Sequence, residues 1–93
     1  LKAGVVIEPE RRVDLVEACR EICQRLAVHP PAPRLDAGEA SVDVMASRDR
    51  LVQALEHLVR NAQQATAASG TVSVRVGRGA QRAEVDIVDT GVG

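Results

Sequence analysis

Residues 48–68 combine a helical repeat with a broad apolar stripe, and this pairing limits the folds open to the chain. At about 100° per residue, one side of the helix collects apolar side chains, which are Leu51, Leu55, Leu58, Val59, Ala62 and Ala65. A helix that is apolar on one side must cover that side with another element. We therefore expect the stripe to lie on a sheet, with the opposite side of the helix left open.

Short extended segments on both sides of this helix can supply the sheet. Residues 71–76 and 83–88 are rich in β-branched side chains and are joined by a loop that contains glycine, which predicts a hairpin. Three shorter segments also fit extended structure, namely residues 11–15, 33–36 and 41–46. The predicted strands are therefore short, and most of them are separated from another predicted strand only by a loop.

A second amphipathic helix is predicted over residues 13–28. It ends before Pro30 and Pro31, because proline cannot continue the helical hydrogen-bond ladder. Cys19 and Cys23 lie on its apolar stripe, and no ligand set accompanies them, so we interpret both as core side chains. Helices mixed with mostly antiparallel strands predict an α+β fold, a two-layer sandwich in which a mixed sheet packs on helices.

The overall composition suits one small domain, since the chain has only 93 residues. We place this domain at residues 11–93, after a linker or edge-strand remnant at residues 1–10. The net charge is -1 and aromatic residues are absent, which argues against nucleic-acid binding. No apolar run is long enough to span a bilayer, so we expect a cytoplasmic location, and any membrane anchor of the parent protein would lie elsewhere.

The polar side of the helix over residues 48–68 carries amides, cations and an imidazole but no carboxylate. Its members are Arg50, Gln53, His57, Arg60, Asn61 and Gln64. A solvated helix face usually mixes both charge signs, whereas a face without acids suits an anion. His57 and Asn61 lie one turn apart, and an asparagine oxygen is a ligand that Mg²⁺ accepts beside water and phosphate. The alternative is a surface helix that happens to lack acids.

The last five residues, Asp89 to Gly93, follow a β-branched strand. A carboxylate at the strand end can accept a hydrogen bond from an exocyclic amine such as that of adenine. Gly91 and Gly93 let the backbone approach a flat ligand closely. The alternative is a tight turn at the end of the strand, where Asp and Gly are common.

Together the two stretches resemble motifs of the histidine-kinase and gyrase-like ATPase superfamily, which shares the Bergerat fold. His57 to Ala62, which reads His-Leu-Val-Arg-Asn-Ala, resembles the core of the N box, and Asp89 to Gly93 resembles the G1 box. Arg12 to Val16 is similar to the stretch that opens the catalytic domain of sensor kinases, and Asn61 to Thr66 is most similar to the nitrogen-regulation type. The resemblance implies that residues 11–93 are the N-terminal part of an ATP-binding catalytic domain.

The resemblance also implies roles for individual residues. Asn61 would hold the Mg²⁺ that bridges the ATP phosphates, and Asp89 would bind the adenine amino group. Gly91 would let the base lie against the backbone, and Gly93 would begin a flexible lid. The implied cofactors are therefore ATP and Mg²⁺.

Arg60 and Gln64 lie where the family's polar or basic residues approach the phosphates. His57 stands where the hydrolases of the superfamily carry a glutamate that activates water, which favours a kinase that delivers the γ-phosphoryl group to a histidine in two-component signalling. A gyrase-like ATPase, an anti-sigma-type serine kinase and a non-catalytic interaction module remain alternatives on the same fold.

Compared with the family, the chain lacks most of the lid, the second glycine-rich box, the last strands and the helical hairpin that carries the phospho-accepting histidine. It begins with Leu1 rather than Met, so we interpret it as a piece of a longer protein, incomplete at its C-terminus. We expect it to bind ATP weakly or not at all, and not to phosphorylate itself. Its implied partners are the acceptor hairpin domain, indirectly a response regulator, and a second copy paired through the open sheet edge.

Overall fold

The computed structural model describes residues 10–90, which form two helices and five strands. In chain order these are β1 (Arg11–Asp14), α1 (Leu15–Leu26), β2 (Arg34–Ala37), β3 (Asp43–Ala46), α2 (Arg48–Gln64), β4 (Val72–Arg78) and β5 (Ala83–Asp89). The helices and strands predicted within residues 11–88 are all present within a few residues of their expected bounds. Residues 1–9 of the expected linker or edge-strand remnant lie outside the described residues. Neither described helix is long and apolar enough to cross a membrane.

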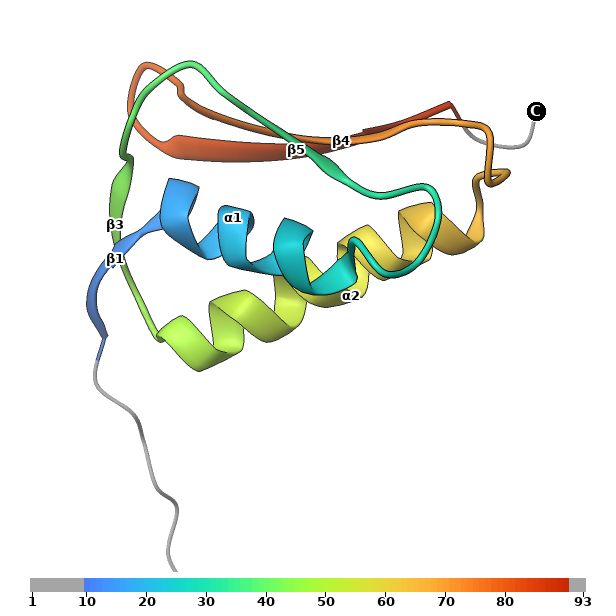
Figure 1. The fold of residues 1–93 in the computed structure, drawn as a ribbon. Coiled ribbons are helices and arrows are strands. Elements are labelled where there is room, and N and C mark those ends of the chain that lie inside the picture. Colours follow the sequence, from blue (N-terminus) through green and yellow to red (C-terminus); the bar gives the residue numbers. More distant parts are fainter. Residues whose placement is uncertain (1–9, 91–93) are drawn as a thin grey trace, which may run out of the picture.

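The elements form two layers, with α1 and α2 lying side by side under a three-stranded sheet (Figure 1). The strand order is β2-β4-β5, in which β2 is parallel to β4 and β4 is antiparallel to β5. β1 and β3 pair separately as an antiparallel ribbon at one end of the helices. The α+β sandwich is thus confirmed, but the described strands form two sheets, because β2 and β3 diverge to different partners instead of pairing with each other.

The core lies between the sheet and the helices. β4 points Val72, Val74 and Val76 inward, and each is at most 4% exposed. Ile22 of α1 and Val59 of α2 meet this row and are each 1% exposed. Burial of one such side chain contributes roughly 1.5–3 kcal/mol, so this contact surface is what holds the helices to the sheet.

The apolar stripe of α2 is rotated from the predicted one. Leu58 is 51% exposed and Ala65 is also exposed, whereas Val52 and Gln63 are buried. The prediction placed the whole stripe on the sheet, and it was wrong because α1 also packs against α2 and takes part of its surface. The buried arc therefore turns toward the corner between α1 and the sheet.

A side-chain hydrogen bond explains where α1 begins. Asp14 caps α1 by accepting from the backbone N–H of Val16 at 3.0 Å, and the same oxygen accepts from the N–H of Val42 at 3.1 Å. Capping by Asp stabilises a helix by about 1 kcal/mol. Asp14 therefore starts α1 and ties it to the chain next to β3.

Cys19 and Cys23 are free thiols in the core, as predicted. Burial raises the pKa of Cys19 to about 11, and it raises the pKa of Cys23 as well. Both therefore behave as small apolar side chains of α1.

Candidate functional site

The outer side of α2 carries a hollow of about 410 Å³. It is lined by Gln53, Glu56, His57, Arg60, Asn61 and Gln64. Five of these six residues belong to the polar face that the helical repeat predicted. Arg50, the remaining member of that face, is not in the lining.

His57 and Asn61 contact each other in this hollow. Asn61 Nδ2 lies 3.2 Å from His57 Nε2, and both side chains are exposed. The spacing of four residues produces this contact, since one helical turn brings the two side chains together. In this orientation the carboxamide nitrogen donates, so the contact is a hydrogen bond in the tautomer of His57 whose Nε2 carries no proton.

Charge in the hollow is set by Arg60 and Glu56. Arg60 makes no ion pair with any residue in the range 10–90, so its guanidinium is available to an anion. Glu56 is not a member of the predicted polar face, but its side chain also reaches the lining. Its carboxylate lies 3.7 Å from Arg25 Nη1 of α1, which offsets the negative charge at the rim.

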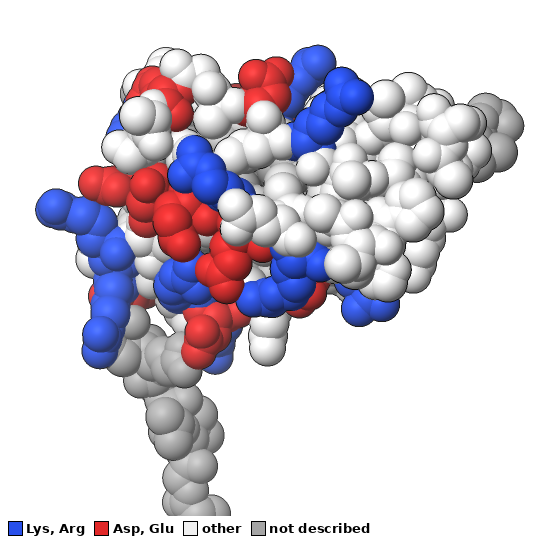
Figure 2. All heavy atoms as spheres, in the orientation of Figure 1, with Lys and Arg blue, Asp and Glu red and all other residues white. Residues whose placement is uncertain are grey.

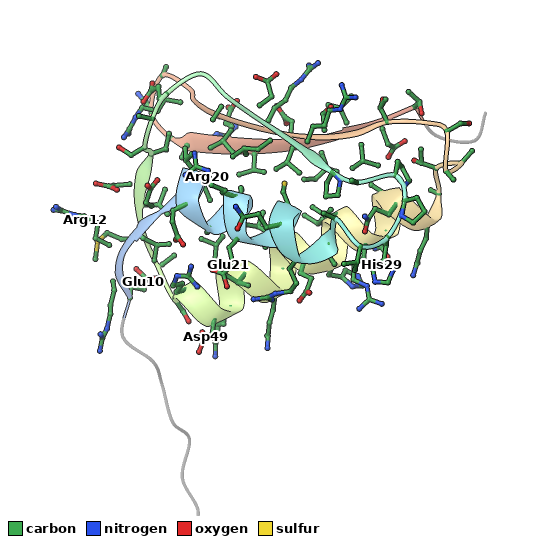
Figure 3. The ribbon with its side chains drawn as sticks, viewed as in Figure 1. Glu10, Arg12, Arg20, Glu21, His29 and Asp49 are labelled. Carbon is green, nitrogen blue, oxygen red and sulfur yellow. The ribbon has the colours of Figure 1, made fainter. Side chains whose placement is uncertain are left out.

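A second hollow of about 380 Å³ adjoins the first and shares Arg60 and Gln64 with it. Its other lining residues are Gln63 of α2 and, from the loop after α1, His29 and Pro30. His29 lies beside α2 in Figure 3. Gln63 holds this loop, because its buried Nε2 lies 3.0, 2.9 and 3.2 Å from the carbonyl oxygens of Leu26, His29 and Pro31. No local pattern in the sequence could reveal this long-range contact.

Asp89 ends β5 on the same side of the sheet as the helices. Side chains alternate along a strand, so Asp89 shares its side with Val85 and Ile87, which pack on the core. The end of β5 and the C-terminal end of α2 also lie at the same end of the molecule (Figure 1). However, Asp89 is exposed and is not in the lining of either hollow on α2.

The two motifs are joined through Gly70. A Cβ atom at Gly70 would lie 2.6 Å from Thr66 Cγ2 and 2.5 Å from Thr90 Oγ1. Thr90 is held in place, since its Oγ1 accepts from the N–H of Thr71 at 3.1 Å. The turn after α2 therefore packs directly on the residue that follows Asp89. The predicted residues Gly91 and Gly93 lie outside the described residues.

Ion pairs hold α1 and α2 together beside the site. Arg48 of α2 binds Glu17 and Glu21 of α1, and Glu21 also binds Arg25. Glu21 points from α1 toward α2 in Figure 3, and Figure 2 shows charged side chains gathered where α1 meets the start of α2. Hydrogen bonding to Arg48 lowers the pKa of Glu21, and the two carboxylates raise the pKa of Arg48.

Comparison with solved structures reveals related folds, whereas neither protein-family models nor curated protein sequences give a match. A mycobacterial sensor histidine kinase, MprB, superposes with a TM-score of 0.76 at 22% identity, covering 88% of this chain and 56% of that chain. The catalytic domain of histidine kinase ThkA, in two nucleotide-free forms, gives TM-scores of 0.77 and 0.78 at 21% identity.

These ThkA matches cover 90% and 91% of this chain and 61% of the other. The chain thus spans a little over half the length of the solved chains that it matches. The chain has the α+β fold of histidine-kinase catalytic domains such as that of ThkA.

Proposed function

We propose that the chain is the ATP-binding part of a histidine-kinase catalytic domain. The observation that carries the proposal is the hollow on α2, where the His57–Asn61 pair lies beside Arg60, which makes no ion pair within the described part of the chain. An amide oxygen and a free guanidinium on one exposed surface suit a magnesium ion and the phosphates that it bridges. The fold shared with histidine-kinase catalytic domains supports the same assignment.

The residues of the hollow suit Mg²⁺, which is bound partly by water and substrate phosphate, better than a metal ion bound by protein side chains alone. No group of three His, Cys, Asp or Glu side chains among residues 10–90 could hold an ion. Mg²⁺ commonly keeps several waters and takes one or two protein ligands together with substrate phosphates. Asn61 would supply the protein oxygen, and the ion would supply neutralisation of phosphate charge.

Asp89 would bind the adenine at the other end of the nucleotide. Its carboxylate lies on the helix side of the sheet and accepts hydrogen bonds, which suits the exocyclic amine of adenine. Gly91 and Gly93 would line the base, and Arg60 and Gln64 would contact the phosphates. The turn at Gly70 connects this end of the sheet to α2 and supports a common site.

Transfer of the γ-phosphoryl group to a histidine of a separate dimerisation domain is the reaction that we propose. Water activation requires a base with a free lone pair, and His57 Nε2 is already the acceptor for Asn61. This supports a kinase, in which a bound nucleotide is protected from hydrolysis. The acceptor hairpin domain and, indirectly, a response regulator would be the partners, in the cytoplasm where ATP is supplied.

Glu56 favours a second candidate function, a gyrase-like ATPase. Its carboxylate lines the hollow and could activate water if it moved away from Arg25. Replacing a general base lowers the rate by about 10²–10⁴-fold. Phosphate release from ATP that falls by this factor in Glu56→Gln would favour the hydrolase over the kinase.

Nucleotide binding to the full-length protein tests the proposal. Asn61→Ala should remove most of the gain in ATP-analogue affinity that Mg²⁺ provides. Asp89→Asn should weaken adenine-nucleotide binding by about 1.5–3 kcal/mol, roughly 10- to 150-fold, because it removes a charged acceptor. Isothermal titration calorimetry with and without Mg²⁺ measures both effects.

Arg50→Ala is the matched control, since Arg50 is exposed on α2 but does not line the hollow. It should bind the analogue like the parent. Parent-like binding by both Asn61→Ala and Asp89→Asn would rule the proposed site out.

A further inference from the structure

The contact between Asn61 and His57 constrains both side chains. Asn61 Nδ2 lies 3.2 Å from His57 Nε2, and the amide nitrogen has no lone pair to offer. With the amide in this orientation His57 Nε2 is the acceptor, and the tautomer that allows this has its ring proton on Nδ1. Because the amide nitrogen is engaged by His57, the amide oxygen of Asn61 faces away from the imidazole.

Within the described structure, no other group fixes the orientation of these two side chains. Among residues 10–90, neither side chain makes another hydrogen bond, and both are exposed on the rim of the hollow. An amide that is held by one neighbour only can rotate when that neighbour is lost. Rotation would exchange the oxygen, which can bind a cation, for the NH₂ group, which cannot.

We infer that His57 is a positioning residue, which orients the amide of Asn61 so that its oxygen faces the magnesium ion. The inference rests on the proposed function, in which Asn61 is the protein ligand of that ion. It gives His57 a role that needs neither proton transfer nor contact with the nucleotide. An imidazole suits this position of α2, because orienting the Asn61 amide requires only a hydrogen-bond acceptor one turn earlier in the helix.

Two substitutions separate orientation from side-chain volume. His57→Gln keeps an acceptor, because the glutamine oxygen reaches about as far from the backbone as imidazole Nε2. His57→Leu fills similar space and has no acceptor. Because one hydrogen bond is at stake, His57→Leu should weaken the Mg²⁺-dependent part of nucleotide affinity roughly three- to tenfold, and His57→Gln should retain it within about twofold.

Nuclear magnetic resonance of the chain without nucleotide or metal tests the geometry directly. Two-bond ¹H–¹⁵N spectra at neutral to weakly alkaline pH should show His57 with its proton on Nδ1. The side-chain NH₂ signals of Asn61 should shift in His57→Leu and stay near their parent positions in His57→Gln. A proton on Nε2, or Asn61 signals that ignore both substitutions, would overturn the inference.

Calorimetry on the full-length protein, with MgCl₂ or with EDTA, provides the functional measurement. The expected result is a loss with His57→Leu that is confined to the Mg²⁺ series, with affinity in EDTA unchanged. Equal losses in both series would mean that His57 acts on the nucleotide or on the fold, which contradicts a positioning role. If Asn61→Ala keeps its full Mg²⁺ dependence, the proposed function fails, whatever the resonance data show for His57.

Discussion

Gly70 is a residue whose importance comes from the space around it. The Cβ of any other residue would overlap Thr66 and Thr90, which come from the end of α2 and the end of β5. Neither threonine can move freely, because Thr66 Oγ1 donates to the carbonyl of Ala62 at 2.7 Å and Thr90 Oγ1 accepts from Thr71. The two proposed nucleotide-binding motifs therefore approach each other through a position where only hydrogen fits.

Gly70→Ala should destabilise the fold by about 1–3 kcal/mol, the usual cost of forcing a methyl group into a packed region. Gly77→Ala is the control, since a Cβ at Gly77 meets nothing within 4 Å. Urea denaturation followed by circular dichroism measures both. Equal stabilities of the two variants would show that the region around Gly70 adapts.

Packing of the two helices depends on charge as well as on the apolar core. Glu21 accepts hydrogen bonds from Arg48 and from Arg25, and these lower its pKa below 4.5, its ordinary value. A carboxyl whose pKa is lower in the folded state stabilises the fold above its unfolded pKa, and that stabilisation is lost as the pH falls through the folded value. The α1–α2 contact should therefore weaken below about pH 4.5.

Glu21→Gln should give a flatter profile of melting temperature against pH in this acidic range, since the carboxylate that would be protonated is already absent. Thermal unfolding at a series of pH values down to about pH 3 measures the profile. Glu84→Gln removes a carboxylate from β5, away from the helix pair, and serves as the control. If both variants flatten the profile equally, the bonds of Glu21 to Arg48 and Arg25 are not the cause.

At the scale of the whole molecule, the outer edge of β5 is one of the two open edges of the three-stranded sheet, the other being that of β2. β5 pairs with β4 along one edge, and no strand among residues 10–90 pairs with the other. α2 packs against β5 and leaves Leu58 half exposed. An unpaired strand edge and a half-exposed apolar side chain are both features through which a second copy can associate.

We predict that the chain associates with itself at high concentration through this surface. Leu58→Lys should weaken the association by about tenfold or more, because it places a charge where apolar contact would form. Met45→Lys is the control, since Met45 is 62% exposed on β3 in the separate ribbon. Analytical ultracentrifugation that finds only monomer, or equal weakening by both variants, would contradict the prediction.

Local sequence patterns were sufficient to predict the helices and strands and most of the residues that line the hollow. The helical repeat of residues 48–68 placed His57, Arg60, Asn61 and Gln64 on one face, and the structure brings them together. Residues 71–76 were predicted to form a strand, and the valines that alternate along it in β4 are buried. These predictions succeed because side-chain direction repeats every 3.6 residues in a helix and every two in a strand, so it depends on neighbours in the chain.

The tertiary structure alone decided the contacts between distant segments. The rotation of the α2 stripe, the reach of Glu56 into the hollow and the hold of Gln63 on the loop after α1 all depend on α1 lying against α2. The parallel pairing of β2 with β4 and the close approach at Gly70 likewise join residues far apart in the chain. A local repeat records which way a side chain points, whereas its partner depends on how the layers stack, and that is a property of the folded molecule.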